Sequence, residues 1–227
     1  MSEKTYRLGL VGVGRMGKNY INVINSMEDV QITHICTTKS ENAKLITNNP
    51  VRITGNYLDL FLDKGLDGII IATPPATHTQ IMKDCAHNFI PFMVEKPMCM
   101  NSKDCVLIQD IVTRNKLACM VDYTHNYSPA FIELKKLFKG RKIEEINSQV
   151  RSFGPFRKDV PMWWDWAPHD LGMILSLIKE FPTKIHAEYI KNEDYDNSGL
   201  LTIELGFKHA EARIIINNTA DTKYRGL

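Results

Sequence analysis

Three glycines near the N-terminus have the spacing of a phosphate-binding turn. Gly12, Gly14 and Gly17 follow a short apolar run and precede a helix-like pattern. The first glycine would permit a tight bend, the second would let the backbone approach a pyrophosphate, and the third would let helix and strand pack closely. Free N–H groups at the helix N-terminus would attract the phosphates. We therefore predict a dinucleotide site that includes Arg15 and Met16; a purely structural turn, or the related loop of methyltransferases, is the alternative.

The end of the second apolar run bears on which dinucleotide binds. An acidic residue there normally recognises the free 2′-hydroxyl of the adenosine ribose. This chain instead has Cys36, Thr37, Thr38, Lys39 and Ser40, which supply hydroxyls and one cation but no carboxylate. The sequence thus favours NADP over NAD, with Thr37, Thr38 and Lys39 as cofactor-binding residues. The alternative is that the lysine and serine belong to an ordinary solvated turn.

Two further turns follow predicted strands, where open α/β sheets bind their ligands. Thr73 and Pro74 follow one strand, with His78 at the start of the next helix, and Glu95 and Lys96 follow another. A desolvated lysine beside a glutamate can lose its proton more readily or hold a substrate hydroxyl. A surface lysine beside a turn proline is the alternative.

A tryptophan-rich segment opens a later helix. Asp165 and His169 are four residues apart, so a helix would turn both to one side at its N-terminus. The imidazole could act as an acid or base, and the carboxylate could orient it. A capping aspartate with a core histidine is the alternative. We expect no metal, because no third ligand is evident nearby.

The first 122 residues alternate short apolar runs with amphipathic, helix-length segments. This pattern predicts a doubly wound parallel sheet with helices on both faces. The predicted strands are Tyr6–Val11, Gln31–Thr37, Val51–Thr54, Gly68–Ala72, Phe89–Val94 and Leu117–Asp122. Helices are predicted around Met16–Met27, at Thr77–His87 and at Ser102–Arg114, the last with Val106, Ile108, Ile111 and Val112 on its buried side.

The pattern changes after Asp122, which predicts a second, α+β domain at 123–227. Alternating apolar residues such as Leu201, Ile203 and Leu205 indicate a sheet with one buried face. Predicted helices are Ala130–Lys139 and Ala167–Glu180, and predicted strands are Glu144–Phe153, Lys184–Lys191, Leu200–Phe207 and Ala210–Asn217.

Composition excludes several classes of partner. The formal net charge is +2 among 227 residues, with no concentrated basic face to predict nucleic-acid binding. No apolar run is long enough to predict a membrane span. The five cysteines form no close pairs, so we expect reduced core residues and a cytoplasmic protein.

Taken together, the motifs resemble the Gfo/Idh/MocA oxidoreductases, the glucose–fructose oxidoreductase and inositol dehydrogenase family. The resemblance is carried by the glycine turn, Thr73-Pro74, Glu95-Lys96-Pro97, the segment Val121–Pro129 and the spaced Asp165 and His169. It implies a Rossmann domain at 1–122, followed at 123–227 by a substrate and oligomerisation domain on an open, mostly antiparallel sheet.

The resemblance also implies roles. A hydride would pass between nicotinamide and a carbinol or carbonyl carbon of a sugar-like substrate, with Lys96 on the reacting hydroxyl. His169 would be the general acid/base, Asp165 would place it, and Glu95 would lie near the cofactor. His125, Asn126 and Trp164 would contact the sugar. The tryptophan-rich version is similar to members in surface-polysaccharide or nucleotide-sugar metabolism.

Members of the family usually continue with further strands and a helix, so we expect the second sheet to be several strands short. An exposed apolar edge would favour a homo-oligomer through that sheet. The alternative function is a non-catalytic NAD(P)-binding sensor or interaction protein derived from such an enzyme.

Overall fold

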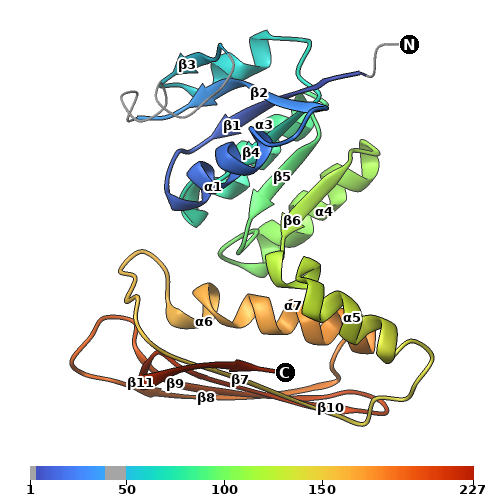
Figure 1. Ribbon diagram of the computed structural model, residues 1–227, viewed down its shortest axis with the longest axis vertical. Helices are drawn as coiled ribbons and strands as arrows, with labels where there is room; N and C mark the ends of the chain where they lie inside the picture. Colours follow the sequence, from blue (N-terminus) through green and yellow to red (C-terminus); the bar gives the residue numbers. More distant parts are fainter. Residues whose placement is uncertain (1–3, 39–49) are drawn as a thin grey trace. The chain divides into compact units, whose positions relative to one another are not determined.

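Six parallel strands form the sheet of the N-terminal half (Figure 1). The computed structural model describes residues 4–38 and 50–227, and the chain divides into two compact units, Met1–Asp122 and Tyr123–Leu227. The strand order of the first unit, β3-β2-β1-β4-β5-β6, confirms the predicted doubly wound sheet. The strands are β1 Tyr6–Val11, β2 Val30–Cys36, β3 Arg52–Thr54, β4 Gly68–Ile71, β5 Phe92–Glu95 and β6 Cys119–Asp122.

Strand β4 shows why this sheet is covered on both faces. Its side chains alternate, so Ile69 and Ile71 pack into one apolar cluster while Ile70 packs into another. Both clusters are buried, which requires a strand that is apolar throughout. Burying each such side chain contributes about 1.5–3 kcal/mol. The central strands therefore form a rigid base for the turns at their carboxyl ends.

Helices cover the two faces of the first sheet. Helix α1, Arg15–Ile24, packs Ile21 and Ile24 against one face, while α3, His78–His87, and α4, Ser102–Arg114, pack against the other. Short 3-10 helices η1 and η2 span Tyr57–Leu62 and Pro75–Thr77.

Two predictions about side-chain burial in this unit need correction. In α4, Ile108 and Val112 are buried at i and i+4, whereas Val106 is 64% exposed because it lies on the far side of the helix. The five cysteines are free, but only Cys36, Cys85 and Cys99 are buried, and Cys119 is exposed.

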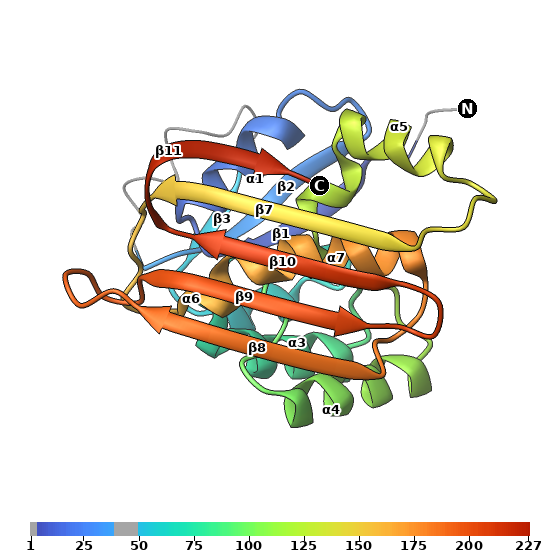
Figure 2. The same cartoon turned by 90° about the horizontal axis from the view of Figure 1, so that it is seen from below.

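The second unit is built on a five-stranded, mostly antiparallel sheet of order β11-β7-β10-β9-β8 (Figure 2). Only the β10–β7 pair is parallel. The strands of this sheet are β7 Glu145–Phe153, β8 Lys184–Lys191, β9 Gly199–Gly206, β10 Glu211–Asn217 and β11 Thr219–Gly226. Strand β11 was not predicted, because its sequence is largely polar and lacks apolar alternation.

Helices lie on one face of this second sheet (Figures 1 and 2). They are η3 Thr124–Tyr127, α5 Pro129–Leu137, α6 Met162–Asp165 and α7 Ala167–Ile178. Ala167 and Ile174 of α7 share a core with Ile214 and Ile216 of β10. The start of α7 is therefore fixed against the centre of the sheet.

Candidate cofactor and active site

A cavity of about 770 Å³ lies at the carboxyl ends of β1, β2 and β4 in the first unit. This is the end of a doubly wound sheet where ligands bind. Six of the predicted cofactor-binding residues line it: Gly12, Gly14, Thr37, Thr38, Thr73 and Pro74. Arg15, Met16 and Gly17 belong to the first turn of α1 and are not among the residues that line the cavity. Lys39 lies outside the described residues.

The glycines of the first turn have different structural roles. Gly12 has a φ of +97°, which side-chain-bearing residues rarely adopt, and a Cβ on it would lie 2.6 Å from the carbonyl oxygen of Ala72. A Cβ on Gly17 would lie 2.1 Å from the carbonyl oxygen of Gly12. A Cβ on Gly14 would meet open space instead. Gly12 and Gly17 thus close the turn, while Gly14 leaves room beside the cavity.

The N-terminus of α1 is suited to an anion. Among the described residues no side chain caps this helix, and its first turn contains no acid. The first N–H groups of a helix have no partner within the helix and carry partial positive charge. Together with the open space at Gly14, this arrangement fits the pyrophosphate of a dinucleotide.

Several cavity residues were not predicted. Tyr57 and Gln80 reach the cavity from η1 and α3, and Gly55 follows β3. The Tyr57 hydroxyl donates to Asp84 at 2.7 Å, and burial followed by this bond raises its pKa to about 12. Gly55 directly follows a strand, and this position could have indicated it as a cavity residue. Tyr57 and Gln80 belong to no motif, and they reach the cavity only in the folded chain, so the sequence alone could not indicate them.

His78 occupies a different place from the predicted one. Its ring is fully buried, with Nε2 2.9 Å from the Thr73 oxygen and Nδ1 3.0 Å from the Pro97 oxygen. The ring therefore joins the turn after β4 to the turn after β5 and is not available to touch a cofactor. The physical reason is that a buried carbonyl group needs a donor, and the neutral imidazole supplies one N–H to one of these two oxygens at a time.

Glu95 is also turned inward. It ends β5, is 8% exposed, and its Oε1 lies 2.6 Å from the hydroxyl of Tyr20 on α1. Lys96 follows it directly and is partly exposed. The carboxyl group thus contacts a tyrosine that had no motif to mark it.

In the second unit, two of the predicted residues lie side by side. The rings of His125 and His169 have centroids 4.4 Å apart and are tilted by 48°. Asn126 donates from its amide nitrogen to the carbonyl oxygen of Gly172 at 3.4 Å. Trp164 is partly buried in α6. This unit therefore brings an imidazole pair and an amide together beside α7.

Asp165 and His169 do not share a helix, contrary to the prediction. Asp165 ends α6, and His169 is in the first turn of α7. A proline is favoured in the first turn of a helix, and Pro168 has that position in α7. Asp165 instead accepts a hydrogen bond from Nη1 of Arg157 at 3.2 Å.

Comparison with known proteins identifies the relatives of this fold. Residues 6–123 match the profile of the Gfo/Idh/MocA group, described as an oxidoreductase family with an NAD-binding Rossmann fold. The chain belongs to this family. The glycine turn and cavity described above lie within the matched part, so they form the NAD-binding Rossmann domain of a Gfo/Idh/MocA member.

Relatives within this oxidoreductase family are similar at modest identity. The rhizopine catabolism protein MocA of Rhizobium meliloti is 28% identical over 132 residues, which are 58% of this chain and 41% of the relative. The inositol 2-dehydrogenase of Rhizobium meliloti strain 1021 is 24% identical over 81% of this chain and 58% of its own length. The chain thus spans about half the length of these curated relatives.

A solved structure from Magnetospirillum magnetotacticum MS-1 matches 98% of this Gfo/Idh/MocA chain and 73% of its own, with a TM-score of 0.90 at 29% identity. Both units of the fold therefore occur together in a solved protein.

No helix among the described residues is long and apolar enough to span a bilayer. Within the same residues no group of three or more His, Cys, Asp or Glu could hold a metal ion.

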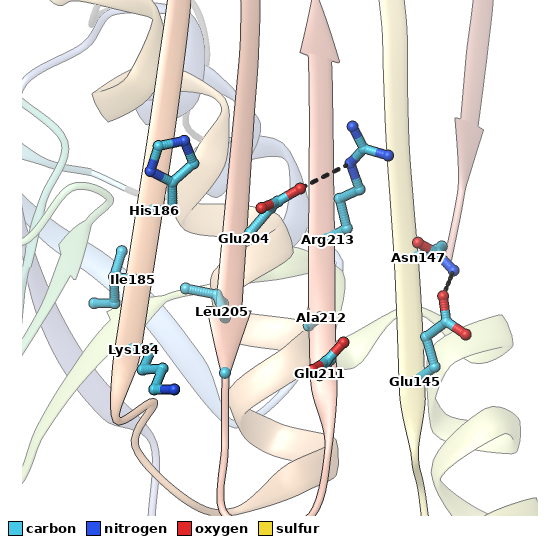
Figure 3. Close-up of a pocket in the computed structure, with 11 residues that line it drawn as sticks. Glu145, Asn147, Lys184, Ile185, His186, Glu204, Leu205, Glu211, Ala212 and Arg213 are labelled. Carbon is cyan, nitrogen blue, oxygen red and sulfur yellow. Dashed lines mark hydrogen bonds and ion pairs between the residues drawn. The ribbon is translucent and has the colours of Figure 1, made fainter.

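A second hollow, of about 420 Å³, lies on the second sheet (Figure 3). Charged and polar side chains dominate it, with Arg213 3.6 Å from Glu204 and Asn147 donating to Glu145 at 2.6 Å. These residues alternate along their strands with the buried core, so they belong to the face away from the helices. The hollow carries none of the predicted catalytic residues.

Proposed function

We propose that this Gfo/Idh/MocA member is an NAD(P)-dependent dehydrogenase or reductase that acts on a sugar-like substrate. The observation that supports it best is the cavity of about 770 Å³ with the glycine turn and the α1 N-terminus at its edge. The bound nicotinamide would supply or accept the hydride. The protein would hold the pyrophosphate with backbone N–H groups and the remainder of the dinucleotide with Thr37, Thr38 and Thr73.

The second part of the proposal concerns proton transfer. Lys96 would hold the reacting hydroxyl or carbonyl oxygen, since an ammonium group stabilises negative charge that develops there. His169 would exchange the proton as general acid and base, and Asp165 would help to place substrate and histidine. The pairing of His169 with His125 supports this role, because a neighbouring imidazole limits the orientations that the ring can adopt.

The substrate class rests on two observations. One relative carries the name inositol 2-dehydrogenase, which refers to a cyclic polyol. In this chain, Trp164 offers an aromatic surface and Asn126 an amide, and both kinds of group are suited to a polyol ring. We therefore propose a sugar, a polyol or a nucleotide-linked sugar as substrate, bound by His125, Asn126 and Trp164.

The cofactor preference is a separate proposal. Cys36, Thr37 and Thr38 line the cavity at the end of β2 and provide no carboxylate for a 2′-hydroxyl. We expect NADPH to bind more tightly than NADH, by about tenfold, or about 1.4 kcal/mol. Titration of each reduced cofactor by protein fluorescence measures the ratio. A tighter complex with NADH would contradict this preference and leave the proposed reaction intact.

The central test is the variant Lys96→Ala. We expect turnover of a panel of polyols and sugars to be lost, at least about a thousandfold, because a positioned charge stabiliser is removed. Cofactor affinity should stay within about twofold of the parent protein. Lys103→Ala, which changes an exposed lysine on α4, is the matched control. Unchanged turnover in Lys96→Ala would overturn the catalytic assignment, and cofactor binding without turnover in the parent protein would favour the non-catalytic alternative.

A further inference from the structure

One hydroxyl group lies between two buried carboxyl groups at the carboxyl ends of β5 and β6. The Tyr20 hydroxyl is 2.6 Å from Oε1 of Glu95 and 2.5 Å from Oδ2 of Asp122. Glu95 and Asp122 are 8% and 6% exposed, and they are register partners at the ends of adjacent parallel strands. All three residues belong to the first unit.

The number of protons in this cluster is limited by chemistry. A tyrosine hydroxyl has a single hydrogen, so it can donate to only one carboxylate at a time. If both carboxyl groups were ionised, one short oxygen–oxygen contact would hold no proton, and two like charges would be buried together. Both contacts are satisfied when one carboxyl group keeps its proton and donates it to the tyrosine oxygen.

We propose that Tyr20, Glu95 and Asp122 share two protons at neutral pH. Glu95 is the protonated carboxyl group and donates to the oxygen of Tyr20, whose hydroxyl donates to Asp122. Tyr20 is thus a positioning residue that fixes the orientation and protonation of Glu95 next to Lys96.

The electrostatic surroundings agree with this assignment of the protons. Burial raises the pKa of Glu95 and the charge of Asp122 raises it further. A hydrogen bond donated by Tyr20, the alternative to its bond with Asp122, would lower the pKa of Glu95, as do the charge and backbone N–H of Lys96; the net direction is upward. Burial and then the bonds to both carboxyl groups raise the pKa of Tyr20, so the phenol keeps its own proton. The charged groups that face Glu95 are therefore Asp122 and Lys96.

A protonated Glu95 has a consequence for the neighbouring lysine. An uncharged carboxyl group attracts the Lys96 ammonium less than a carboxylate would, which leaves more of that positive charge to act on a substrate oxygen. This consequence rests on the proposed function, in which Lys96 holds the reacting group. The protonation itself does not, because it is a property of the protein without cofactor or substrate.

Infrared spectroscopy of the unliganded protein with ¹³C-labelled glutamate tests the proposal directly. At pH 7 we expect a C=O band of a protonated glutamic acid that is absent from Glu95→Gln and retained in Glu180→Gln, an exposed control. Failure to observe this band, or its persistence in Glu95→Gln, would overturn the proposal. Neither result depends on turnover, so the outcome is separate from that of the Lys96→Ala experiment.

The variant Tyr20→Phe distinguishes positioning from simple packing. Its ring is retained, but the oxygen that accepts the Glu95 proton and the hydroxyl that donates to Asp122 are lost, so the band should disappear at lower pH than in the parent protein. An unshifted titration midpoint would show that Tyr20 only packs. If Tyr20→Phe fails to fold, the pH dependence of unfolding tests the shared proton instead. The unshifted pKa of a glutamate is 4.5, and above this pH the unfolded chain loses the proton that folded Glu95 keeps. The unfolding constant of the parent protein, divided by that of Glu95→Gln, should therefore increase by up to about tenfold per pH unit above pH 4.5. A ratio independent of pH would count against the shared proton.

Discussion

Buried polar groups determine the geometry of the crevice end of the first sheet. His78 holds two backbone turns from a fully buried position, with one ring nitrogen on the Thr73 oxygen and the other on the Pro97 oxygen. Burial lowers the pKa of His78, and the bonds to the carbonyl groups only partly oppose this. The folded protein therefore favours the neutral ring, whereas the unfolded chain takes up a proton below pH 6.5.

This difference predicts a loss of stability in acid. As pH falls below 6.5, protons bind the unfolded state first, so the free energy of unfolding should fall by up to about 1.4 kcal/mol per pH unit for this residue. Urea unfolding at pH 5.0 and 7.5 measures the change. His78→Asn should reduce the pH dependence, while His87→Asn, at an exposed histidine on the same helix, should leave it nearly unchanged. Equal slopes in His78→Asn and the parent protein would contradict the prediction.

Individual residues also show where sequence reasoning reaches its limit. Gly12, Gly14, Thr73 and Pro74 could be predicted, because each lies directly after a strand in a recognisable motif. Tyr20 and Tyr57 could not, since their partners are far away in the sequence. His78 was assigned to the cofactor from its position, but its ring lies buried between the carbonyl oxygens of Thr73 and Pro97.

At the scale of elements, apolar periodicity predicts buried structure well and exposed structure poorly. All six strands of the first sheet could be predicted from short apolar runs, most clearly β4, whose residues are all buried. Strand β11 could not, because it is polar and pairs with β7 through its backbone. The short helix α6 was also missed, whereas the start of α7 at Ala167 was predicted, in agreement with Pro168 in its first turn.

The glycine turn leads to a prediction that separates folding from binding. Gly14→Val places a side chain in open space, so the protein should fold normally while cofactor affinity falls by about tenfold or more. Gly12→Ala forces a Cβ against the Ala72 carbonyl at a positive φ, so it should destabilise the fold by about 1–3 kcal/mol. Thermal unfolding and cofactor titration of both variants distinguish the two effects. Full cofactor affinity in Gly14→Val would contradict the assigned phosphate site.

On the scale of the whole molecule, the two units have different surfaces. The first sheet is covered on both faces, whereas the second sheet has helices on one face and charged side chains on the other (Figure 3). The second sheet also ends in β8, where Ile185 and Ile190 are 68% and 65% exposed. Exposed apolar side chains along an edge strand, with unpaired backbone groups beside them, favour association with another copy.

We therefore predict that the protein self-associates through the second sheet. Ile185→Lys combined with Ile190→Lys should weaken the dimer by at least about a hundredfold, because two charges would replace apolar surface that is buried on association. Sedimentation equilibrium over a range of protein concentrations measures this change. Val23→Lys, at an exposed apolar residue on α1 of the first unit, is the matched control and should leave the dimer intact. A monomeric parent protein would contradict self-association, and a dimer that survives the double substitution would assign the interface to a surface other than the β8 edge.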